Sequence, residues 1–279
     1  MSQLVDQIQE ELLEAIEDDA LILPTLPEVA IRVREAAENP NIGTHELSRV
    51  ISNDAALSAR LIKVVNSPLL RGNREINDLQ SAIDRLGINY TCSLAIGLAM
   101  EQMFQATHEV VDAKLREAWS RSIEIAAISQ VLCRHFTRLQ PDQATLAGLV
   151  HQIGILPILT YAEERELLLG DPESLEHVIE RLHPQLGERI LQAWEFPAAI
   201  ACVPRLVQNF ARDSQKVDYV DVVQVAILQS HLGTRHPLTK LDWSSVPAFA
   251  KLGFNPSVDI HSDQDLHGAL CVAMNMLQQ

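Results

Sequence analysis

The segment from Gln143 to Ala162 has no Asp, Glu, Lys or Arg, over a length close to that of a membrane-spanning helix. The apolar side chains of such a segment are withdrawn from water either in a protein core or in a bilayer. His151, Gln152 and Pro157 lie in the middle of the segment, where a bilayer would leave polar groups without partners. We therefore expect a buried core helix that breaks near Pro157, and no membrane span.

Most of the remaining chain shows helical periodicity, with apolar residues recurring at intervals of three and four, and strand-like alternation is nearly absent. Asp171 and Pro172 form a typical helix start. Pro184 and Pro197 are expected to open two further helices, and Gly87 to end one in the left-handed conformation. The sequence therefore predicts an all-α fold, a compact helical bundle.

The charge balance limits the partners of the protein. The chain has 22 basic and 37 acidic residues, and its formal net charge of −15 repels phosphate backbones and anionic membrane surfaces. We therefore expect no nucleic-acid partner. The N-terminus lacks the basic region of a signal peptide, and the four cysteines are far apart, as is typical of reduced thiols in a cytoplasmic protein.

Several motifs occur in a fixed order along the chain. The stretch from Leu23 to Leu70 opens with "LPTLP", continues with "SNDAALSARLI" and closes near "VVNSP". It is followed by "LQSAIDRLGINYT" from Leu79, "WSRSIEIAAIS" from Trp119 and "LAGLVHQIGIL" from Leu146. In order and spacing, these motifs resemble the HDOD domain, the HD-related output domain of bacterial signalling proteins.

The resemblance implies an HD-domain-like helical bundle and divides the chain into three parts. Residues 1–17 are expected to form an N-terminal helix. Residues 18–230 are expected to form the HDOD domain, with an N-terminal helical half at 18–110 and an HD-like half at 111–230. Residues 231–279 are expected to form a C-terminal loop and helical extension.

The resemblance also implies where a catalytic site would lie. The related HD phosphohydrolases hold one or two divalent cations with a His from one helix, an adjacent His-Asp pair from another and a later Asp. These ligands combine imidazole with anionic oxygen, and the metal lowers the pKa of a bound water. At the place of the pair this chain has His151 and Gln152, so a neutral amide replaces the carboxylate. At the place of the first His, two residues after Trp119, it has Arg121, a permanent cation.

Two further positions belong to the same site. The later Asp is expected near Val225–Leu228, a stretch without any carboxylate. His183, in "ERLHPQLG", matches a His position common to HD and HDOD sequences. We expect His151 to be a core histidine hydrogen-bonded to a neighbour, with Gln152 supplying one such bond, rather than a metal ligand. The resemblance thus implies a degenerate pocket formed by Arg121, His151, Gln152 and His183, with no metal, no cofactor and no catalytic residue.

We expect a non-enzymatic regulatory module of the bacterial cytoplasm that acts through contacts with signalling proteins, which the sequence does not identify. HDOD domains are often joined to receiver, nucleotide-cyclase or diesterase domains, and since no motif of these occurs here, such partners are expected as separate proteins. Two alternatives stay open. In the first, the degenerate pocket binds a small anionic ligand such as a nucleotide and acts as a sensor, because a guanidinium suits phosphate. In the second, an altered metal site still hydrolyses phosphoesters. The oligomeric state is not predicted.

Overall fold

The computed structural model of the chain describes residues 11, 14, 23–67, 75–163 and 165–278. In this part of the chain every regular element is a helix, so the predicted all-α fold is confirmed. The N-terminal helix predicted at 1–17 lies almost wholly outside the described residues. The described elements are α2 (Glu28–Glu38), α3 (Thr44–Ile51), α4 (Ala55–Val65), α5 (Leu79–Leu86), α6 (Ile88–Met100), η1 (Glu101–Met103), α7 (Glu109–Phe136), α8 (Pro141–Val150), α9 (Ile155–Glu163), α10 (Glu166–Leu169), α11 (Pro172–Ala193), α12 (Ala198–Ala201), α13 (Val203–Leu206), α14 (Tyr219–Ser230), η2 (Pro237–Lys240), η3 (Trp243–Ser245), α15 (Pro247–Leu252) and α16 (Gln264–Leu277).

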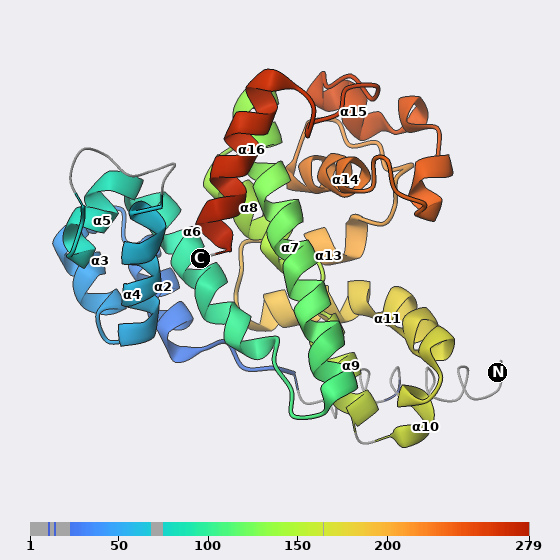
Figure 1. The fold of residues 1–279 in the computed structure, drawn as a ribbon, viewed down its shortest axis with the longest axis horizontal. Coiled ribbons are helices and arrows are strands. Elements are labelled where there is room, and N and C mark those ends of the chain that lie inside the picture. The colour runs from blue at the N-terminus through green and yellow to red at the C-terminus, as the bar shows by residue number, and fades with distance from the viewer. Residues whose placement is uncertain (1–10, 12–13, 15–22, 68–74, 164, 279) are drawn as a thin grey trace.

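Helices α2 to α6 gather on one side of the molecule, and α10, α11, α14 and α15 lie on the other (Figure 1). The long helix α7 runs between them and packs against α8, α14 and α16. α6 also packs against α8, and the C-terminal helix α16 returns to contact α4. One apolar core cluster therefore extends from Leu26 to Leu277 and includes residues of both halves and of the C-terminal extension.

Two local predictions from the sequence are corrected. Pro184 does not open a helix but lies inside α11. The helix continues because Leu182 and Leu186 are buried on either side of the proline, and this burial offsets the one backbone hydrogen bond that proline cannot donate. Gly87 ends α5 with a positive φ of 83°, but its ψ of 154° is not that of the left-handed helix, because α6 begins at the next residue.

The uncharged segment forms two helices in the middle of the fold. α8 ends at Val150 and α9 begins at Ile155, so the break lies in the turn between them, and Pro157 falls in the first turn of α9, where a proline costs no helical hydrogen bond. Pro141–Glu163 is long and apolar enough to cross a membrane, yet 83% of its most apolar window is buried inside the fold. This burial supports the predicted core helix.

Two glycines of this segment let neighbouring helices approach it closely. A Cβ atom at Gly148 would lie 2.5 Å from the Cα of Ala126 in α7. A Cβ atom at Gly154 would lie 2.0 Å from the carbonyl oxygen of His183 and 2.6 Å from the backbone nitrogen of Gly187, both in α11. Backbones that approach this closely exclude any side chain. The turn between α8 and α9 is therefore held between α7 and α11.

A buried carboxylate fixes the start of α14. Asp221 is fully buried, and it accepts hydrogen bonds from Arg212 Nη1 at 3.1 Å and from Lys251 Nζ at 2.5 Å. Asp221 and Asp218 also form a reciprocal capping box at the first turn of α14. Because Lys251 belongs to α15, the cluster ties the C-terminal extension to α14.

Substituting Gly154 with alanine should destabilise the fold. The new methyl group would collide with the backbone of α11, and overpacking of this kind costs about 1–3 kcal/mol. We expect a correspondingly lower free energy of unfolding in urea. Gly268→Ala in α16 is the control, since no atom lies within 4 Å of the added Cβ and alanine favours a helix by about 0.5–1 kcal/mol. Equal stability of the two variants would contradict the close approach at Gly154.

Candidate functional site

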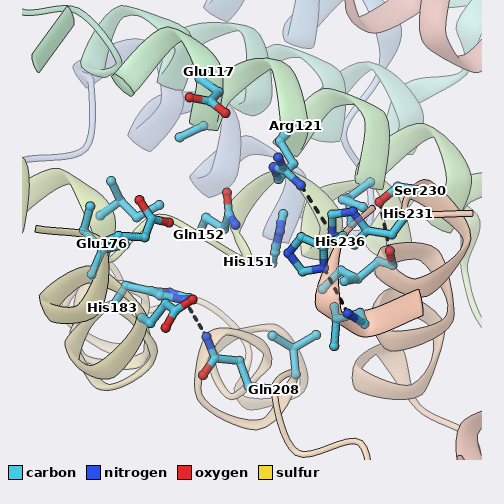
Figure 2. Close-up of a pocket in the computed structure, with 18 of the residues that line it drawn as sticks. Glu117, Arg121, His151, Gln152, Glu176, His183, Gln208, Ser230, His231 and His236 are labelled. Carbon is cyan, nitrogen blue, oxygen red and sulfur yellow. Dashed lines mark hydrogen bonds between the residues drawn. The ribbon is translucent and has the colours of Figure 1, made fainter. Parts of the chain in front are cut away.

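All four residues predicted for the degenerate pocket line one cavity of about 550 Å³. Arg121 comes from α7, His151 and Gln152 from the turn between α8 and α9, and His183 from α11. Figure 2 shows these side chains around the cavity, together with residues of α14 and of the segment near η2. The glycine contacts described above bring the three contributing segments together.

His151 is a buried neutral histidine. Its Nδ1 lies 2.6 Å from the carbonyl oxygen of Gly148, so Nδ1 carries the proton and Nε2 is left as an acceptor. Burial lowers the pKa of His151 to about 4, and the charge of Arg121 acts in the same direction. The expectation that Gln152 supplies the hydrogen bond is wrong, because the carbonyl of Gly148 is free at the end of α8 and takes that place. Gln152 is directed into the cavity instead (Figure 2).

Arg121 is the cation at the centre of the site. Its Nη1 lies 3.4 Å from His231 Nε2 and donates to it. Within the described residues Arg121 forms no salt bridge. Its charge acts on the half-buried Glu124, whose pKa is raised by burial and lowered in smaller part by His261 and Arg121. Because Arg121 forms no salt bridge within the described residues, its guanidinium keeps donors available to a ligand.

His183 forms another wall of the cavity. It is buried, and its Nε2 lies 2.8 Å from Gln208 Nε2, which can donate to it. Burial, assisted by the nearby His151, lowers the pKa of His183 to about 3. Its Nδ1 is buried and has no hydrogen-bond partner in the structure. A buried polar atom without a partner lowers the stability of the fold at this position.

Sequence reasoning missed two histidines of the site. His231 follows α14 and His236 precedes η2, and their rings stack with centroids 3.7 Å apart and planes 5° from parallel. Burial lowers the pKa of His231 to about 4, and His236 and Arg121 act in the same direction. Both rings face Arg121 in the cavity (Figure 2). No motif marks this pair, because the loop that carries it follows the last helix of the predicted HDOD domain.

Charged side chains form the outer part of the cavity. Glu117 and Lys114 extend from α7, and Glu176 and Glu180 from α11. Lys114 Nζ lies 3.4 Å from a carboxylate oxygen of Glu176, so the positive charge of Lys114 and the negative charge of Glu176 neutralise each other. Glu117 and Glu180 remain as negative charge on the lining.

The donor set does not fit the metal centre that the HD resemblance implies. Arg121 would repel a cation at the place of the first ligand, and Gln152 offers only a neutral carbonyl oxygen. Ile227, in the stretch where the later Asp is expected, lines the cavity, while the buried Asp221 is held by Arg212 and Lys251. The described residues contain no group of three or more His, Cys, Asp or Glu placed to hold a metal ion.

Comparison with known proteins adds a family and a fold. The model of the HDOD domain family matches residues 23–209. A solved protein from Shewanella amazonensis SB2B, whose description proposes a metal-dependent phosphohydrolase, is 31% identical and superposes with a TM-score of 0.85 over 99% of this chain and 100% of that one. A protein from Marinobacter aquaeolei VT8, whose description proposes a role in signal transduction, is 21% identical, with a TM-score of 0.67 over 100% of this chain and 67% of that one. At 21% identity, the similarity to the Marinobacter protein shows a shared fold alone.

A curated relative is longer than this chain. An uncharacterised protein of Treponema pallidum (strain Nichols) is 24% identical over 201 residues, which are 67% of this chain and 38% of that protein. The chain thus spans well under half the length of this relative, and its similarity concerns one part of a larger protein.

Acid should destabilise the protein through its buried histidines. Burial lowers the pKa of His151 to about 4, whereas an unfolded histidine titrates near 6.5. Between these values the unfolded chain binds a proton that the folded chain does not, so the free energy of unfolding falls as pH falls. His151→Asn does not titrate and keeps an amide donor for Gly148. We expect this variant to lose about 2 kcal/mol less than wild type between pH 6.5 and pH 4, measured by urea unfolding.

The control for this experiment is His177→Gln, which removes an exposed histidine of α11. We expect this variant to keep the pH dependence of the wild type. If His151→Asn also followed the wild-type curve, the neutral, buried state of His151 would be disproved.

Proposed function

This chain belongs to the HDOD family, and on that premise we propose that it is a non-catalytic regulatory module of a bacterial, cytoplasmic signalling system. HDOD domains occur in proteins that resemble signal-transduction proteins, and this supports the assignment to a signalling system. The observation that carries the non-catalytic part is the position of Arg121 inside the cavity, where a hydrolase needs a metal ligand.

The charges that line the cavity disfavour metal-dependent catalysis. Metal-dependent phosphoester hydrolysis needs a cation held by anionic or neutral donors, and the metal must activate a water molecule. In this cavity a permanent cation lies beside His151, and the adjacent Gln152 is an uncharged amide. The description of the similar Shewanella protein proposes a metal-dependent phosphohydrolase, so the support for a non-catalytic role comes from the donor residues of this chain rather than from its fold.

The module would act by contact with other signalling proteins. Its formal net charge of −15 favours partners with basic surfaces over nucleic acid or anionic membranes. We propose residues 18–230 as the HDOD domain and 231–279 as an extension that shares its core.

A second function is favoured by the cavity itself. Arg121 lines the cavity and has donors without a carboxylate partner within the described residues. A cavity of about 550 Å³ is of the size that holds a small molecule. We propose that the regulatory module is also a sensor, in which a small anionic ligand binds in this cavity.

Metal content tests the proposed lack of catalysis. We expect purified protein, incubated with manganese, zinc or iron salts, to retain less than about a tenth of an equivalent by elemental analysis, because bare two-histidine sites bind weakly. The double variant Arg121→His with Gln152→Asp returns imidazole and carboxylate to the places that the HD centre uses. We expect this variant to retain clearly more metal than wild type. Stoichiometric metal in wild type that is lost in His151→Ala, with phosphoesterase activity, would overturn the proposal.

A further inference from the structure

We propose that the cavity binds an amphipathic monoanion, a molecule with a single carboxylate or similar group on an apolar body, and that Arg121 holds the anionic group. This inference rests on the sensor function proposed above and defines the chemical class of its ligand. It excludes polyanions such as nucleotides.

The cavity has both the size and the apolar wall for such a molecule. Its volume of about 550 Å³ lies within the range of small-molecule sites. Aliphatic side chains from several elements line it and offer no hydrogen bond, so they favour an apolar ligand body: Ile125, Ile155, Leu159, Ile179, Ile227 and Leu238.

Arg121 provides one fixed anchor for an anion. Within the described residues its one hydrogen bond is the 3.4 Å contact with His231, and a guanidinium has further donors in a planar fork. A carboxylate matches this fork with two parallel hydrogen bonds. Desolvation inside the cavity strengthens the attraction relative to a surface pair.

The histidines add polar contacts but no further positive charge. His151 and His183 are buried and neutral, because burial lowers the pKa of each imidazole to about 4 and about 3, respectively. The Nε2 atom of His151 can accept a hydrogen bond from a ligand hydroxyl or amide. His183 also lines the cavity, and its Nε2 already lies 2.8 Å from Gln208 Nε2.

The acidic part of the lining restricts the total charge of the ligand. Glu176 is paired with Lys114, while Glu117 and Glu180 form no salt bridge within the described residues. A single anionic group at Arg121 is balanced by that cation. Additional phosphates would face the exposed carboxylates of Glu117 and Glu180, and like charges placed side by side repel each other. The balance of charges therefore favours a monoanion.

The extension beyond the family match also contributes to the site. His236, Pro237 and Leu238 line the cavity, although the HDOD match covers residues 23–209. Trp243 Nε1 donates to the carbonyl oxygen of Leu238 at 2.9 Å and holds this segment in place. A ligand in the cavity would therefore contact both the HDOD domain and its extension, which is a route by which binding could change the surface seen by a partner.

Calorimetric titration with naphthalene-2-carboxylate tests the proposal, with naphthalene-2-carboxamide as the neutral analogue and ATP as the polyanion. We expect wild type to bind the carboxylate and to bind both other compounds at least about tenfold more weakly. Arg121→Gln should weaken carboxylate binding at least about tenfold, and Arg121→Lys should recover part of the loss. Arg116→Gln is the matched control, because Arg116 lies on the same helix but pairs with Asp112 at the surface. This control should bind as wild type does.

Each other result overturns the inference. If no variant binds the carboxylate at millimolar concentration, the cavity is not a site for an amphipathic monoanion. If ATP binds and depends on Arg121, the ligand class is wrong while the sensor function stands. If the carboxamide binds as well as the carboxylate, Arg121 is not the anchor. Because the readout is binding, a metal-dependent hydrolase activity found separately would overturn the non-catalytic function alone.

Discussion

The close approach of three backbone segments determines how this protein is built. Gly148 lets α7 contact α8, and Gly154 lets α11 contact the turn that precedes α9. No side chain fits at either contact, so the turn with His151 and Gln152 is confined between two helices. Arg121 and His183 lie on those helices and are thereby brought to the same cavity. The site therefore follows from the packing of the core.

Within that packing, the chemistry of the site depends on where positive charge can exist. Buried histidines stay neutral because a charged imidazole inside the protein would lack the hydration that it has in water. Arginine cannot lose its proton, so Arg121 supplies a constant charge at the centre of the lining. The same cation that repels a metal attracts an anion. Arg121 thus contributes both to the proposed lack of hydrolysis and to the proposed binding of a ligand.

The helical class and the four pocket residues could be predicted from the sequence, because periodicity depends on local spacing and motif order places residues on a known scaffold. Other features depend on tertiary contacts. Pro184 is a helix-opening signal in isolation, but burial of its neighbours keeps α11 continuous. The partner of His151 is a backbone carbonyl, which has no sequence signal. His231 and His236 reach Arg121 through a loop whose course depends on contacts with the extension, including that of Trp243.

The most direct test of this account is a crystal structure of wild type grown with both manganese chloride and 4-bromobenzoate. Anomalous scattering from manganese and from bromine, recorded at separate wavelengths, locates each atom independently. We predict a bromine peak within the cavity, with the carboxylate at Arg121, and no manganese peak beside His151 and Gln152. A manganese peak at those two residues, with no bromine peak in the cavity, would contradict it.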